Sequence, residues 1–192
     1  MMFKEQTFKS LCKQAWSGVG LTIGQNEGVY VLGGGYWIIK IKREALSNKA
    51  MATLIELTGH LPDEGELWMS RKDEADQYEL DYGFDVYNTE SIYEQSIEIE
   101  PKNILIEQNN AVTRVMQDET EKIILINECF IQLIDNKHIM TEIGEEFTDQ
   151  PRRHEAAVIW KNNMCELVCY KRTLDEHSNQ QEIILTLEKA RL

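Results

Sequence analysis

The stretch AVIWKNNMCELVCY, residues 157–170, decides the class of fold. Its two apolar runs flank Asn162-Asn163, and asparagine tolerates the backbone conformations that tight hairpin turns require. The stretch therefore predicts two strands joined by a short turn. Because hairpins pair neighbouring strands antiparallel, we expect the rest of the sheet to be mostly antiparallel as well.

The same pattern recurs upstream and downstream of this hairpin. Short apolar runs bounded by turn residues predict strands at residues 19–23, 29–32, 36–41, 66–69, 103–106, 111–116 and 122–126. Beyond these strands, residues 81–86 are a candidate edge strand. Residues 182–190 fit either a strand or a helix: the alternation of Ile183, Leu185 and Leu187 favours a strand, and Ile184 breaks it. Apolar residues at helical spacing predict helices at residues 4–16, 48–58 and 128–134. The result is an α+β fold of about nine strands in mostly antiparallel sheet(s), with two or three helices.

The composition excludes several classes of protein. The 192 residues include 33 Asp and Glu against 20 Lys and Arg, a net charge of −13, so we expect no direct binding of nucleic acid. No apolar run approaches the roughly 18 residues of a membrane span, and the first residues lack the apolar core of a signal peptide. The four cysteines form no Cys-x-x-Cys pair. We therefore expect a cytoplasmic protein with reduced, mostly buried thiols and no membrane contact.

The negative charge is concentrated in one part of the chain. Residues 63–100 hold 13 acidic and two basic side chains, net −11, whereas residues 1–62 carry a net charge of +3. A pattern of strands, helix and strands also occurs on either side of the acidic part. These features predict an N-terminal α+β subdomain (residues 1–69), an acidic connecting segment (70–100) and a C-terminal α+β subdomain (101–192), with one continuous domain as the alternative.

Aromatic residues interrupt the acidic segment, unlike a disordered acidic tail. They are Tyr78, Tyr82, Phe84, Tyr87 and Tyr93. We expect each ring to anchor the backbone to a core while the carboxylates stay outside. Such a surface fits two roles: a solvated face that keeps the protein soluble, or a binding site for a basic partner.

No recognised catalytic motif occurs in the sequence. The motifs Gly-x-Ser-x-Gly, His-Glu-x-x-His and Gly-x-Gly-x-x-Gly are absent, and Gly33-Gly34-Gly35 lacks the Lys-Ser/Thr of a P-loop. We therefore expect no enzyme activity, no catalytic residues, no bound metal and no cofactor. A metal-dependent hydrolase is the least favoured alternative, with Asp73, Asp76 and Asp81 as candidate ligands for Mg²⁺ or Ca²⁺.

In charge and aromatic content, residues 63–100 resemble phage-borne acidic inhibitors that mimic nucleic acid, such as anti-CRISPR and anti-restriction proteins. The resemblance rests on charge and on no shared motif. It implies a non-enzymatic interaction protein of phage or mobile-element origin. Its acidic face would bind and inhibit a basic nucleic-acid-binding protein or ribonucleoprotein, for example a CRISPR effector or a restriction enzyme. The residues expected to make this contact, with the two tyrosines packed at its centre, are Asp73, Glu74, Asp76, Tyr78, Glu79, Asp81, Tyr82, Asp85 and Glu90.

Two other stretches are similar to the strand-helix-strand units of sliding clamps, namely residues 30–46 and the hairpin 157–170. This similarity implies an alternative function as a clamp-like accessory factor in DNA replication, which would assemble into a ring. A clamp needs basic side chains on the helices that line its hole. The first two expected helices carry only Lys4, Lys9, Lys13 and Lys49.

Overall fold

The structure is a computed structural model that describes residues 2–74, 78–80, 83–108, 111–135, 151–155, 157–171 and 180–189. The strands are β1 (Leu21–Asn26), β2 (Val29–Gly33), β3 (Trp37–Lys42), β4 (Leu67–Ser70), β5 (Tyr78–Glu79), β6 (Ile97–Gln108), β7 (Ala111–Asp118), β8 (Ile123–Asn127), β9 (Arg152–His154), β10 (Ala157–Lys161) and β11 (Cys165–Tyr170). The α-helices are α1 (Glu5–Ser17), α2 (Asn48–Thr58), α3 (Glu90–Glu94), α4 (Glu128–Leu133) and α6 (Gln180–Lys189). Two short 3₁₀ helices are η1 (Arg43–Ala45) and η2 (Asp85–Tyr87).

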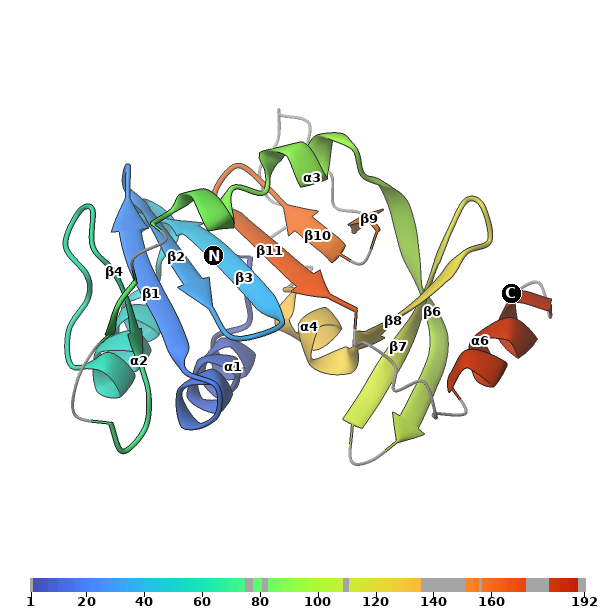
Figure 1. Cartoon of the computed structure of the whole chain (residues 1–192), viewed down its shortest axis with the longest axis horizontal. Coiled ribbons are helices and arrows are strands. Elements are labelled where there is room, and N and C mark those ends of the chain that lie inside the picture. The colour runs from blue at the N-terminus through green and yellow to red at the C-terminus, as the bar shows by residue number, and fades with distance from the viewer. Residues whose placement is uncertain are drawn as a thin grey trace.

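The strands form one antiparallel sheet in the order β5-β4-β1-β2-β3-β11-β10-β9-β6-β7-β8 (Figure 1). The predicted α+β class and antiparallel pairing are confirmed. The described residues contain eleven strands and five α-helices, more than the numbers predicted. The hairpin β10–β11 pairs Trp160 with Leu167 and lies near the centre of the sheet. Strand β11 also pairs with β3, so the sheet is continuous between the N-terminal and the C-terminal strands. The division of the chain into two subdomains and a connecting segment stays a prediction.

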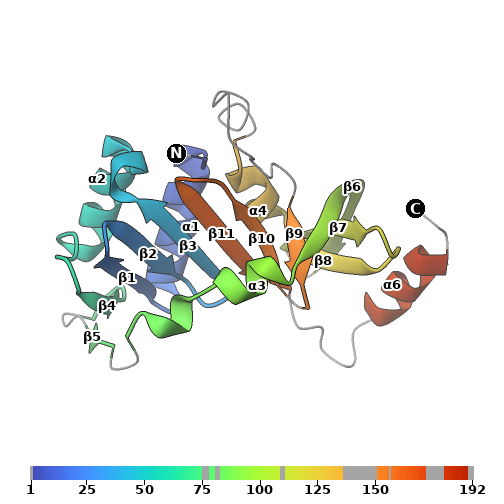
Figure 2. The same cartoon turned by 90° about the horizontal axis from the view of Figure 1, so that it is seen from above.

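Both faces of the sheet are covered. Helices α1, α2 and α4 lie on one face, and η2 and α3 lie on the other (Figure 2). On the first face, Phe8, Leu54 and Phe130 belong to the main core, together with strand residues such as Ile39 and Leu167. The second face carries a smaller core, made of Val31, Ile38, Leu67, Tyr87, Ala157, Ile159 and Val168.

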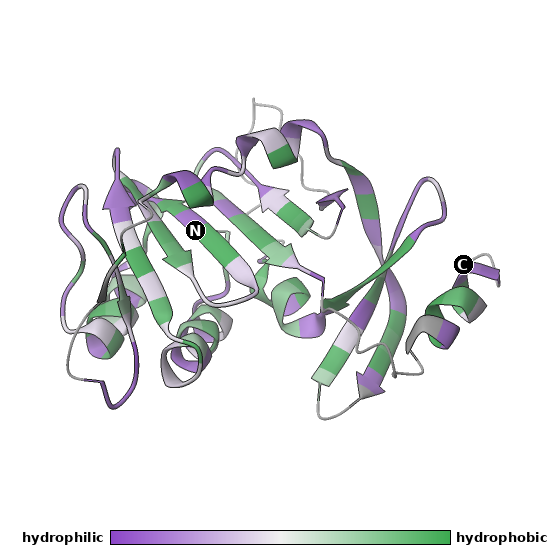
Figure 3. Cartoon of the chain, viewed as in Figure 1, coloured by the Kyte–Doolittle hydropathy of each residue, from purple (hydrophilic) through white to green (hydrophobic). Residues whose placement is uncertain are grey.

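This double cover explains the composition of the central strands. Residues Ile38 and Ile39 are both buried although successive side chains point to opposite faces, and so are Leu167 and Val168. A strand buried on two faces needs a continuous apolar run instead of an alternating one. Figure 3 shows the central strands as mostly hydrophobic, whereas β6 alternates hydrophilic and hydrophobic residues.

Local capping sets the ends of two helices. The Ser47 side chain accepts a hydrogen bond from the Ala50 backbone N–H (3.2 Å) at the start of α2. Gly59 follows that helix with φ of 85°, a conformation that glycine adopts without strain. At α4, the Asn127 side chain accepts from the Cys129 N–H (3.1 Å).

Two predicted strands are wrong. Residues 85–87 form η2 instead of part of an edge strand, since Gly83, with φ of 61°, turns the chain after the true edge strand β5. The C-terminal segment is the helix α6. There Ile184 and Leu187, three residues apart on one helical face, pack against a small core on β7 and β8, and Leu185 is 53% exposed.

Candidate partner-binding site

The acidic segment crosses the second face of the sheet as a strap, defined here as residues 84–96. It includes η2 and α3 and runs from β1 towards β9 (Figure 2). Its first two anchors are aromatic rings seated on glycines. A Cβ atom at Gly24 of β1 would lie 2.9 Å from Cε1 of Phe84, and one at Gly33 of β2 would lie 3.6 Å from Cε1 of Tyr87. Gly24 thus leaves room that the Phe84 ring needs, whereas the Tyr87 ring lies at ordinary contact distance from Gly33.

A buried polar contact anchors the middle of the strap. Thr89 is 1% exposed, and its hydroxyl donates a hydrogen bond to the Glu166 carboxylate on β11. The same hydroxyl accepts from Nζ of Lys40 on β3 (2.7 Å). Since buried polar groups are costly unless paired, these bonds favour one position of the strap on the sheet.

Cations on β9 and β10 hold the far end of the strap. The Lys161 Nζ stands 4.8 Å from the ring centroid of Tyr93, and the Arg152 guanidinium lies 5.7 Å from it. Such cation–π contacts contribute about 0.5–2 kcal/mol each, depending on exposure. Arg152 also donates to the Ser96 hydroxyl (2.9 Å) and to the Ser96 carbonyl (2.5 Å).

The cations beneath the strap are already neutralised by carboxylates other than those on its outer side. Nitrogen–oxygen distances are 3.6 Å for Lys40–Glu166 and 3.8 Å for Lys161–Glu166. Arg152 lies 3.5 Å from Glu98, just beyond the strap. The positive charge of the sheet face is therefore not available to the strap's outward carboxylates.

Those outward carboxylates are Asp85, Glu90 and Glu94. All three are exposed, and none forms an ion pair with a residue that the structure describes. Glu90 and Glu94 begin and end α3, four residues apart on one helical face. Like charges at this spacing destabilise a helix by about 0.2–0.5 kcal/mol. The outer side of the strap thus carries concentrated, unpaired negative charge at a small cost in stability.

The structure places the predicted contact residues in several locations. Asp85 and Glu90 lie on the strap. Asp73 lies in a turn after β4 with φ of 66°, and Glu74 pairs with Arg71 at 3.0 Å. The backbone of residues 78–79 forms the edge strand β5. Outside the described residues lie Asp76, Asp81 and Tyr82.

Sequence reasoning missed part of the strap. Glu94 was not among the expected contact residues, although its spacing from Glu90 marks one helical face. The rings that anchor the strap are Phe84, Tyr87 and Tyr93, all packed on the second core. They support the expectation that aromatic residues hold the acidic backbone to a core. The central packing expected of Tyr78 and Tyr82 concerns side chains outside the described set.

The described residues give little support to the two alternative functions. No group of three or more His, Cys, Asp or Glu side chains among them is placed to hold a metal ion. On the helical face of the sheet, Lys9 pairs with Glu56 at 2.7 Å and Lys49 with Glu5 at 3.0 Å. Helix α4, beside α1, contains no Lys or Arg. This face is therefore not the strongly basic surface that a DNA-encircling ring requires.

Comparison with known proteins adds no family. A scan against protein-family models and a search of curated proteins found no match to this chain. Among the helices of the described residues, none has the length and apolar character needed to cross a membrane.

Proposed function

We propose that this chain is a non-enzymatic binding protein, of the kind carried by phages and mobile elements, whose acidic strap imitates nucleic acid. The strap would dock on the basic nucleic-acid-binding surface of a protein or ribonucleoprotein and inhibit it. The observation that carries the proposal is the outer side of the strap, where Asp85, Glu90 and Glu94 are exposed on an anchored backbone and form no ion pair with a described residue.

Anchoring favours binding for a simple thermodynamic reason. A flexible acidic tail loses conformational entropy when it binds, whereas a backbone already fixed by Tyr87, Thr89 and Ser96 loses little. The net charge of −13 adds long-range attraction towards a basic partner and speeds association at low salt. A surface kept only for solubility has no need to place two glutamates four residues apart on a single helical turn.

The test compares two triple variants with the same change in net charge. The strap variant is Asp85→Asn, Glu90→Gln, Glu94→Gln. The control variant is Glu107→Gln, Glu119→Gln, Glu121→Gln, which neutralises exposed carboxylates around β6 and β7. Tagged wild-type protein and both variants are incubated with nuclease-treated lysate of a candidate host, washed at low and high salt, and the retained proteins are identified by mass spectrometry.

We expect the wild type and the control variant to retain a nucleic-acid-binding protein that DNA or RNA displaces. The strap variant should bind it about tenfold or more weakly, and high salt should weaken binding by the wild type. Equal retention by the strap and control variants would show that only net charge matters and would refute the proposal. Retention of no basic protein by the wild type would favour the solvated-surface role.

A further inference from the structure

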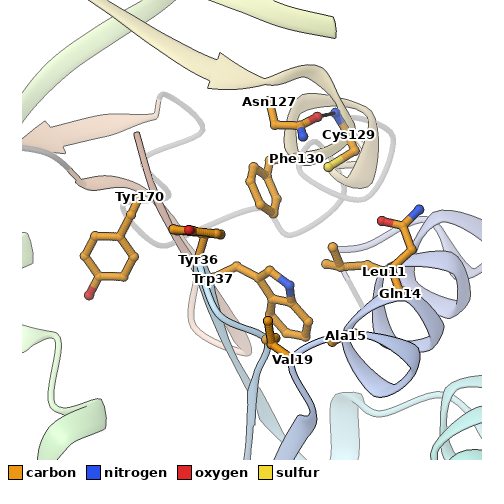
Figure 4. A pocket seen from close by; sticks show the side chains of 12 residues that line it. Leu11, Gln14, Ala15, Val19, Tyr36, Trp37, Asn127, Cys129, Phe130 and Tyr170 are labelled. Atoms are coloured by element: carbon orange, nitrogen blue, oxygen red, sulfur yellow. Dashed lines mark hydrogen bonds between the residues drawn. The ribbon is translucent and has the colours of Figure 1, made fainter. Parts of the chain in front are cut away.

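A second feature, on the helical side of the sheet, is a pocket of about 340 Å³ between α1, α4 and the start of β3 (Figure 4). Leu11, Gln14 and Ala15 line it from α1, Phe130 and Cys129 from α4, and Trp37 from β3. The volume falls within the range of small-molecule sites. It is also about twice the size of an apolar cavity known to hold one benzene ring.

Three aromatic rings contribute to the walls of the pocket. The rings of Tyr36, Trp37 and Phe130 lie around it, whereas the ring of Tyr170 points away from it and packs against the second core (Figure 4). At its rim, Tyr36 is 64% exposed and Val19 is 55% exposed. The edges and faces of such rings favour stacked or edge-to-face contact with another aromatic ring.

The triple glycine shapes this pocket. The Trp37 indole folds back over Gly34, where a Cβ atom would lie 2.5 Å from ring carbons Cε2 and Cζ2. Any other residue at position 34 would therefore push the indole out of place. The glycine run, which carries no phosphate-binding pattern in the sequence, is needed to keep one wall of the pocket in position.

The lining of the pocket favours an uncharged ligand. Every residue that lines it is uncharged. A charged ligand group would lose its hydration there without gaining an ion pair, which is strongly unfavourable. The indole Nε1 of Trp37 faces α1, and no hydrogen bond joins it to the other residues drawn in Figure 4. A ligand atom that accepts a hydrogen bond would satisfy this donor.

We infer that the pocket binds an uncharged molecule with two fused aromatic rings and a hydrogen-bond acceptor that takes the Trp37 N–H. The rings of Tyr36, Trp37 and Phe130 supply stacking surface, the volume fits two rings, and the indole N–H supplies a directed polar contact. This site is separate from the strap, so the inference does not depend on the proposed function.

Nuclear magnetic resonance tests the site directly, because the chain has only four tryptophans. Each indole N–H gives its own cross-peak in a ¹H–¹⁵N spectrum, and the variant Trp37→Phe identifies that of Trp37. The probes are quinoline, which has an acceptor nitrogen, naphthalene, which has none, and 2-naphthoate, which is charged. Fragments of this size bind with dissociation constants of about 0.1–5 mM.

We expect quinoline to move the Trp37 indole peak downfield and to bind at least about threefold more tightly than naphthalene, with 2-naphthoate weakest. The variant Ala15→Leu, which fills the pocket, should abolish the shift while the other three indole peaks keep their positions. A second measurement needs no variant: quinoline should slow the reaction of the Cys129 thiol with a small maleimide. No shift of the Trp37 peak with quinoline, or equal binding of all three probes, would overturn the inference.

Discussion

Substitution of two glycines beneath the strap tests how closely the strap packs on the sheet. A Cβ atom at Gly24 would lie 2.6 Å from Cδ1 of Leu67, 2.8 Å from the Glu66 carbonyl oxygen and 2.9 Å from Cε1 of Phe84. Carbon atoms in good contact are about 3.5–4.0 Å apart. Gly24→Ala therefore forces two side chains and a backbone carbonyl to move by roughly 0.5–1 Å, at a cost of about 2–3 kcal/mol.

Gly33 is the matched control. A Cβ atom there would lie 3.5 Å from Cβ of Thr22 and 3.6 Å from Cε1 of Tyr87, both ordinary contacts. Gly33 does not require a left-handed conformation, so Gly33→Ala also loses less chain entropy on folding. We expect the free energy of unfolding of Gly33→Ala to lie within about 0.5 kcal/mol of the wild type.

Equilibrium unfolding in urea measures both variants. With a urea slope of about 2 kcal/mol per molar, the midpoint of Gly24→Ala should fall by roughly 1 M, while that of Gly33→Ala should stay near the wild type. Hydrogen exchange of the strap amides adds a local readout, because displacement of Phe84 should speed exchange over residues 84–88 in Gly24→Ala only. Equal midpoints for the two variants would refute the seating of the strap on Gly24.

Three further predictions concern other parts of the molecule. Burial raises the pKa of Asp118, but hydrogen bonds from Thr120, Arg153 and the Lys122 N–H outweigh burial and hold it below its usual value. Asp118→Asn should therefore cost about 3 kcal/mol at pH 7, and urea midpoints should converge with those of the wild type as the pH falls below about 4. Burial raises the pKa of the Cys129 thiol to about 11, so its reaction rate with a maleimide should rise about tenfold per pH unit from pH 8 to 10, and a plateau near pH 9 would contradict this. Glu94→Lys should raise the free energy of unfolding, measured in urea, by about 0.5–1 kcal/mol and weaken partner binding.

Locally determined features could be predicted from the sequence. The ends of α2 and α4 follow from Ser47 and Asn127, whose side chains bond to backbone N–H groups two or three residues away. The β10–β11 hairpin follows from its turn and flanking apolar runs. These signals lie within a few residues of one another, so the rest of the fold hardly alters them.

Features set by distant contacts could not be predicted. The alternation over residues 182–190 favours a strand, but Ile184, the residue that breaks it, packs on the core of β7 and β8 in a helix. The path of the strap depends on Gly24, which lies 60 residues before Phe84, the ring that it receives. The continuous apolar runs in β3 and β11 do indicate that something covers the second face, but not which segment.

The strap that covers the second face of the sheet also carries the exposed negative charge. A broad layer of helices would place surface charge far from the sheet. Here the cover includes only one short α-helix, α3, of five residues, and the aromatic rings and buried hydroxyl groups of the strap hold it on the sheet. Its outer side is therefore free to carry charge, and the position of Glu94 is informative. Glu94 ends α3, where the helix dipole favours a cation, and it lies four residues after Glu90, where a lysine would attract and a glutamate repels.

A role in solubility alone predicts that Glu94→Lys stabilises the fold and leaves every interaction unchanged. A role in binding predicts that the same variant is more stable and binds its partner less well, because the fold gives up stability to keep charge on that turn. Stability and affinity measured on this one variant separate the two roles.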